Sequence, residues 1–183
     1  MNLSAWILKR FGWKVEVTVP DFPKAIICVA PHTSNWDFIL GELAIRSVGR
    51  SAGFLMKSTW FFFPLGSLFR AMGGIAVQRG KGKHRRSLVE EMVHRFSESN
   101  RLVVAITPEG TRKRTTQWHT GFLRIAYEAD VPVCLGVLDY EHRHIMIRDI
   151  LETTGDINAD LRTVKNFYSP FRGKYPDKFT TDD

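Results

Sequence analysis

The feature that most constrains the fold of this chain is a steady alternation of short apolar runs with longer, more polar segments. The apolar runs predict strands at residues 14–19, 24–30, 52–57, 73–79, 101–106, 131–140 and 144–149. The segments between them predict helices at residues 35–48, 87–96, 121–129 and 157–168. Short strands that alternate with helices are typical of an α/β fold with a mixed, largely parallel central sheet flanked by helices.

We expect one domain over residues 1–183, because no linker, repeat or low-complexity block divides the chain. A chain of this length can bury a sizeable core. Within the domain we expect an N-terminal interfacial helix and first strand in residues 1–24. The core that carries the candidate site should lie in residues 25–140, and a hairpin and helix in residues 141–183.

The net charge of the chain predicts an anionic partner. Lysine and arginine number 26 against 19 aspartates and glutamates, which gives a formal charge of +7. Phosphates, an acidic carrier protein, anionic lipid and nucleic acid all fit that charge, so charge alone does not choose among them. Both cysteines, Cys28 and Cys134, lie in apolar runs and are interpreted as core residues. The first 13 residues lack the pattern of a signal peptide, which favours a cytoplasmic location.

Two segments are rich in aromatic residues. Residues 58–69 are uncharged but fall short of the ~20 residues that a membrane-spanning helix needs. They include Trp60 and Phe61, and residues 1–13 place further aromatics beside Lys9 and Arg10. Core packing explains such side chains, but aromatics next to basic residues also suit a membrane interface. We therefore expect peripheral association with the membrane, without a spanning segment.

His32 and Asp37 stand five positions apart at the start of a predicted helix. Inside one helix they would lie about 140° apart and could not meet. They can meet if His32 lies in the turn before the helix and Asp37 in its first turn. Ser34 and Asn35 are both suitable N-cap residues, so a capped helix start explains the same stretch without any catalysis. The spacing leaves both interpretations open.

A second polar stretch, TPEGTRKR at residues 107–114, directly follows a predicted strand. Ligands of α/β proteins bind at the carboxyl ends of strands, and Arg112 offers a planar fork for a phosphate or carboxylate. Gly110 permits a close approach of the backbone. An ordinary charged turn is the alternative explanation.

Several other motifs carry less information. GKGKHRR at residues 80–86 adds positive charge but lacks the spacing of a P-loop. GRSAG at residues 49–53 matches the nucleophile elbow of hydrolases around Ser51, but a helix precedes it and a strand follows, which reverses the required order. His142 and His144 have no third ligand nearby for a metal, and His119 is interpreted as a surface histidine.

Taken together and in this order, the stretches resemble the glycerolipid acyltransferase family. The histidine–aspartate block is matched by His32 and Asp37, and the strand that ends in arginine by residues 73–79. Residues 108–112 match the Pro-Glu-Gly-Thr-Arg block in full, and residues 131–137 resemble the Val-Pro strand. The Lys-containing stretch at residues 56–66 also resembles one in the family.

The resemblance implies an acyltransferase that moves an acyl group from acyl-CoA or acyl carrier protein to a lysophospholipid hydroxyl. His32 would be the base and Asp37 would orient it. The implied acceptor-binding residues are Arg79, Glu109, Gly110, Thr111 and Arg112. Lys57, Lys81 and Lys83 would contribute to binding the donor, and neither a metal nor another cofactor is implied.

The acceptor stays open, because Pro31, Thr107 and Lys113 differ from the residues of many relatives. Lysophosphatidate, another lysolipid or a lyso-aminolipid all fit. Two other functions remain as alternatives: a serine esterase that uses Ser51, and a non-catalytic module that binds anionic lipid. Nucleic acid is not expected as a partner, because the aromatic residues form no recognition motif.

Overall fold

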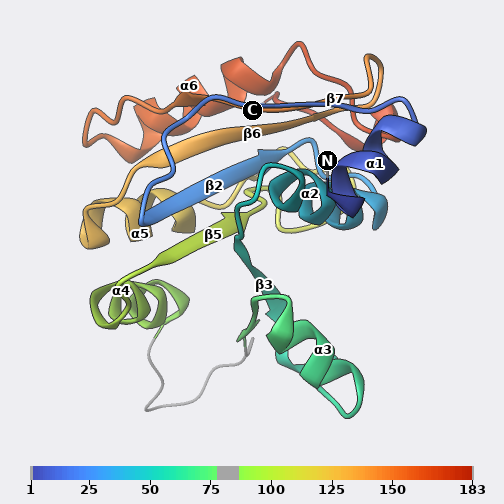
Figure 1. Cartoon of the computed structure of the whole chain (residues 1–183). Helices are drawn as coiled ribbons and strands as arrows, with labels where there is room; N and C mark the ends of the chain where they lie inside the picture. The colour runs from blue at the N-terminus through green and yellow to red at the C-terminus, as the bar shows by residue number, and fades with distance from the viewer. Residues whose placement is uncertain (1, 78–86, 183) are drawn as a thin grey trace.

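The computed structural model describes residues 2–77 and 87–182, and over these residues the strands form one seven-stranded sheet. The strand order is β1-β7-β6-β2-β5-β3-β4 (Figure 1). The strands are β1 (Lys14–Val17), β2 (Lys24–Ala30), β3 (Gly53–Lys57), β4 (Gly74–Val77), β5 (Leu102–Ile106), β6 (Val133–Asp139) and β7 (His144–Ile150).

The sheet is mixed and largely parallel. The strands β2 to β6 pair in parallel, whereas β7 pairs antiparallel with β6 and β1 pairs parallel with β7. The predicted α/β fold of a single domain is therefore confirmed.

Helices cover both faces of the sheet. They are α1 (Leu3–Arg10), α2 (Trp36–Ser47), α3 (Leu65–Ala71), α4 (Leu88–Glu98), α5 (Gly121–Ala129) and α6 (Ile157–Tyr168). Side chains alternate between the faces of β2, so Ile26 and Cys28 pack in the main core with residues of α4, α5 and α6. On the other face, Leu40 of α2 packs with Leu8 of α1 and Leu138 of β6.

Among the described residues, the sequence predicted every strand near its observed position. It also predicted five of the six helices: α2, α4, α5 and α6 by their residue ranges, and α1 as an N-terminal helix within residues 1–24. It did not predict α3 or the short 3₁₀ helix Ser58–Trp60 that precedes it. Both lie in the aromatic run of residues 58–69, where the apolar residues are consecutive and show no helical period.

The sheet splits at one place. β3 pairs with β5 only through Gly53–Val104 and Phe54–Ala105, but it pairs with β4 along four positions. The carboxyl half of β3 therefore leaves β5, and Figure 1 shows it running toward α3 at the edge of the molecule. This split opens space beside the carboxyl ends of β2 and β5.

Within residues 2–77 and 87–182, no helix is long and apolar enough to cross a bilayer. Several aromatic side chains of the two aromatic segments are nevertheless exposed: Phe63 is 88% exposed, Phe11 66% and Trp60 54%. Phe61 is only partly exposed, since its ring packs near Phe69. Core packing therefore does not explain most of these aromatics.

Candidate active site

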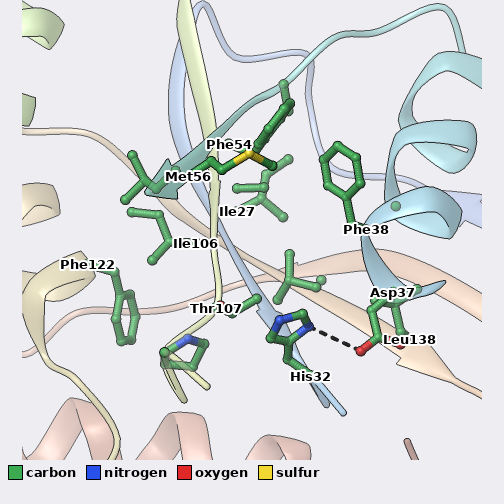
Figure 2. Close-up of a pocket in the computed structure, with 18 of the residues that line it drawn as sticks. Ile27, His32, Asp37, Phe38, Phe54, Met56, Ile106, Thr107, Phe122 and Leu138 are labelled. Carbon is green, nitrogen blue, oxygen red and sulfur yellow. Dashed lines mark hydrogen bonds and ion pairs between the residues drawn. The ribbon is translucent and has the colours of Figure 1, made fainter. Parts of the chain in front are cut away.

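His32 and Asp37 meet at the carboxyl end of β2. The strand ends at Ala30, His32 lies in the following loop, and Asp37 lies in the first turn of α2. The His32 Nδ1 atom is 3.1 Å from Asp37 Oδ2 (Figure 2). The His32 side chain is 20% exposed and that of Asp37 only 2%. His32 thus lies before the helix and Asp37 in its first turn, which is the arrangement that allows two residues at this spacing to meet.

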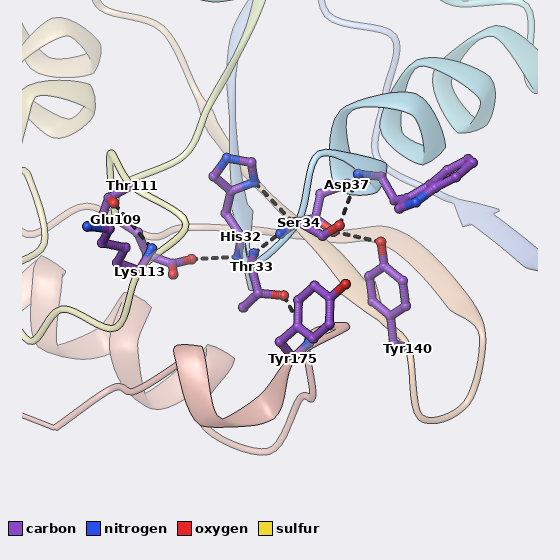
Figure 3. A network of polar contacts seen from close by, with 10 residues as sticks. His32, Thr33, Ser34, Asp37, Glu109, Thr111, Lys113, Tyr140 and Tyr175 are labelled. Carbon is purple, nitrogen blue, oxygen red and sulfur yellow. Dashed lines mark hydrogen bonds and ion pairs between the residues drawn. The ribbon is translucent and has the colours of Figure 1, made fainter.

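The Asp37 carboxylate also organises the backbone around it. Its Oδ2 atom accepts hydrogen bonds from the amides of Thr33, at 2.7 Å, and Ser34, at 2.8 Å. Its Oδ1 atom accepts one from the Tyr140 hydroxyl at 2.6 Å (Figure 3). Asn35, the N-cap residue of α2, makes no side-chain capping bond. The two interpretations of this stretch are thus not exclusive, because one carboxylate binds the amides of the helix start and the histidine.

This network assigns the tautomer of His32. An ionised carboxylate only accepts hydrogen bonds, so the His32 Nδ1 atom must carry the proton that it donates to Asp37. The Nε2 atom then keeps its lone pair, on the side of the ring away from Asp37. His32 is therefore oriented as a base.

A pocket of about 1610 Å³ opens beside His32, where β3 leaves β5. Apolar side chains form much of its wall, as Figure 2 shows, among them Ile27, Phe38, Phe54, Met56, Ile106, Phe122 and Leu138. Five lysines and arginines of the described residues also line it: Lys57, Arg112, Lys113, Arg124 and Lys178. The pocket therefore combines a long apolar wall with cationic groups near a base.

The loop after β5 is tied to His32 through Glu109. This carboxyl is 2% exposed, and its Oε1 atom accepts a hydrogen bond of 2.7 Å from the His32 amide (Figure 3). Burial raises the pKa of Glu109 to about 8; the His32 amide lowers it and the charge of Asp37 raises it. Glu109 is not among the residues that line the pocket, so its contact is with the His32 backbone.

The remaining residues of the PEGTR stretch line the pocket. Gly110 has a φ of +61°, and a Cβ there would come within 2.5 Å of His119 Cδ2. The positive φ and the nearby His119 ring therefore favour glycine at this turn. The Thr111 hydroxyl accepts a hydrogen bond from the Lys113 amide at 3.2 Å, and the exposed Arg112 side chain borders the pocket.

The other predicted residues do not all lie in the described part of the chain. Lys57, at the end of β3, lines the pocket, whereas Arg79, Lys81 and Lys83 lie outside the described residues. Ser51 lies between α2 and β3, in the reversed order that argues against a nucleophile elbow.

The two histidines of the predicted hairpin each bond to a different carboxylate. His142 Nδ1 is 2.7 Å from Asp139, and His144 Nε2 is 3.3 Å from Glu16. They therefore do not converge on one site.

Sequence reasoning missed three groups of this region. Tyr140 follows β6, a strand that pairs with β2, and this adjacency could have placed it near Asp37. Lys178 comes from the C-terminal 3₁₀ helix Pro176–Lys178, and His119 borders the pocket beside Gly110. No local motif marks Lys178 or His119.

Comparisons with known proteins concern the family and the fold of the chain. The sequence model of the family described as Acyltransferase matches residues 14–135. A search of curated protein sequences gives no match. Among solved structures, the chain is similar to the 1-acyl-sn-glycerophosphate (LPA) acyltransferase PlsC from Thermotoga maritima, with 15% identity and a TM-score of 0.55. The similarity covers 90% of this chain and 75% of that one, and at such identity it shows a shared fold. Because the family model matches well over half of the chain, this protein belongs to the acyltransferase family.

Proposed function

We propose that this protein transfers a fatty acyl group from acyl-CoA or acyl carrier protein to the hydroxyl of a lysophospholipid such as 1-acylglycerol-3-phosphate. The observation that carries the proposal is the oriented His32–Asp37 pair beside a large, mainly apolar pocket. No other cofactor or metal takes part in the proposed reaction.

In the proposed reaction the acceptor hydroxyl attacks the carbonyl carbon of the thioester. His32 Nε2 takes the hydroxyl proton as the new C–O bond forms, and Asp37 stabilises the imidazolium. The C–S bond then breaks, and the thiolate leaves with the proton that His32 returns. The substrate thus supplies the hydroxyl that a serine supplies in a hydrolase, and such a positioned base contributes about 10²–10⁴-fold to the rate.

The pocket supports a lipid substrate. A fatty acyl chain gains about 0.8 kcal/mol for each methylene group that it buries, so an apolar wall favours long chains. Arg112 and Thr111 border the same pocket and suit a phosphate head group. We assign Glu109 to positioning this loop, and Arg79 to the acceptor. The basic residues Lys57, Lys81 and Lys83 are assigned to the donor.

The two alternative functions receive less support. A serine esterase would need Ser51 after a strand, whereas Ser51 precedes β3. Labelling of Ser51 by a fluorophosphonate would revive that alternative. A non-catalytic lipid-binding module leaves the oriented His32–Asp37 pair without a role.

Acyl transfer should be detected by mass spectrometry when the protein is incubated with acyl-CoA and a panel of lysolipids. His32→Ala should lower product formation at least a hundredfold, because the base is lost. His142→Ala is the matched control, since His142 forms a similar pair with Asp139 but does not line the pocket. Near-normal turnover of His32→Ala would contradict the proposal.

Asp37→Asn tests whether Asp37 serves only the helix start. A pure capping role predicts a stability loss of about 1 kcal/mol and unchanged activity. We expect instead a loss of activity far greater than the change in melting temperature, because asparagine stabilises no imidazolium. Asp139→Asn provides the comparison, because Asp139 also accepts backbone amides and pairs with a histidine.

Arg112→Lys should raise the KM for a phosphorylated acceptor roughly tenfold, because lysine keeps the charge but loses the two-pronged fork. The KM for acyl-CoA should stay unchanged. Arg114→Lys is the control, since Arg114 is exposed and does not line the pocket. A two-substrate kinetic matrix measures both constants. A change confined to the acyl-CoA constant would assign the loop to the donor instead.

We further propose that the protein works as a peripheral protein on the cytoplasmic face of the membrane. Exposed aromatics on α1 and beside α3 support this. Replacing Trp60 and Phe63 with serine should reduce co-sedimentation with anionic vesicles. Tyr175→Ser is the control, because Tyr175 is also exposed but lies outside both aromatic segments. High salt should weaken binding only in part, because salt does not screen apolar burial. If the wild type failed to sediment with the vesicles at low salt, the proposed membrane association would be wrong.

A further inference from the structure

Tyr140 contacts the side of Asp37 that faces away from His32. Its hydroxyl donates to Asp37 Oδ1 at 2.6 Å, while His32 and the two loop amides all use Oδ2. In the described part of the chain, Tyr140 is the one donor to Oδ1. The two oxygens of this carboxylate therefore serve different partners.

The rest of the structure holds Tyr140 in place. Its amide donates to the Arg172 carbonyl at 2.9 Å, which ties it to the segment after α6. Its ring meets the Trp13 ring edge-on, with centroids 5.1 Å apart and planes at 90°. Burial, and next the hydrogen bond to Asp37, raise the pKa of Tyr140 far above its ordinary value. The phenol thus keeps its proton and remains a donor.

A donor on Oδ1 has two physical effects on the pair. It fixes the plane of the carboxylate, so that Oδ2 faces His32 Nδ1. It also withdraws negative charge from the carboxylate, which weakens the attraction between Asp37 and a protonated His32. The first effect keeps the Nε2 atom free to accept a proton, and the second favours the neutral form of the ring.

We propose that Tyr140 is a positioning residue that acts through Asp37 and sets the pH range over which His32 is a base. The proposal rests on the function proposed above, in which His32 takes a proton. We do not assign Tyr140 to substrate binding, because its side chain does not line the pocket.

The other ionisable groups around the pair do not duplicate this role. Glu109, on the loop after β5, bonds to the His32 backbone and interacts with the charge of Asp37. Tyr175, in the C-terminal segment, interacts with Tyr140, and its amide donates to the Thr33 hydroxyl at 3.2 Å. Neither makes a hydrogen bond to an oxygen of Asp37 in the described residues.

Tyr140→Phe tests the proposal, because it removes only the hydroxyl. We expect the acid limb of the kcat profile to move up by about one pH unit, so that kcat falls roughly tenfold at pH values below this limb and by a smaller factor within it. At higher pH the variant should recover most of the wild-type rate. Both KM values should stay unchanged.

Tyr127→Phe is the matched control, because the Tyr127 hydroxyl also donates to a carboxylate, that of Asp160, away from the pocket. It should change stability and leave the pH profile in place. An unmoved acid limb in Tyr140→Phe, with the same fractional loss at every pH, would overturn the proposal. So would a rise in KM at constant kcat.

A second readout separates this proposal from the proposed function. The titration of the His32 ring, followed by NMR in the absence of substrates, should shift to higher pH in Tyr140→Phe and stay in place in Tyr127→Phe. This shift is expected even if no acyl acceptor is found. An unshifted titration would overturn the role of Tyr140, whatever reaction the protein catalyses.

Discussion

The site depends on one buried carboxylate, that of Asp37. Its oxygens accept hydrogen bonds from two loop amides, a tyrosine hydroxyl and the His32 ring, which come from the β2–α2 loop and from the residue after β6. A buried carboxylate is costly unless such donors surround it, so the fold must bring them together. The same donors that stabilise the charge also direct it at His32. Stability of the helix start and orientation of the His32 ring are thus consequences of one arrangement.

The parallel sheet explains how residues distant in sequence form this arrangement. β2 pairs with β5 on one side and β6 on the other, so the loops that follow these strands meet at one edge. Glu109 reaches the His32 backbone from the loop after β5, and Tyr140 reaches Asp37 from the end of β6. The early departure of β3 from β5 opens the apolar pocket beside them. The pair therefore faces a space that suits lipid chains.

Sequence patterns predicted the elements well, because strand period and helix starts are local signals. For His32 and Asp37, the patterns permitted a contact but did not by themselves decide between catalysis and a capped helix start. They could not predict contacts set by the three-dimensional arrangement. Glu109 was expected at the head group but bonds to the His32 amide. Tyr140 belongs to no local motif, and only the pairing of β6 with β2 places it near Asp37. The split between β3 and β5 also has no local pattern, since it depends on where two strands stop pairing. The sequence did not predict the helix α3, because consecutive aromatic residues show no helical period.

The most direct test of this account is the tautomer of His32, observed by ¹⁵N NMR of the substrate-free protein near neutral pH. If Asp37 organises the site as described, Nδ1 carries the proton and Nε2 shows the chemical shift of an unprotonated nitrogen. His142, whose Nδ1 atom pairs with Asp139 in the exposed hairpin, gives a reference signal for a histidine–carboxylate pair in the same spectrum. A proton on Nε2, or an averaged signal like that of free imidazole, would contradict the account, because His32 would then not be an oriented base.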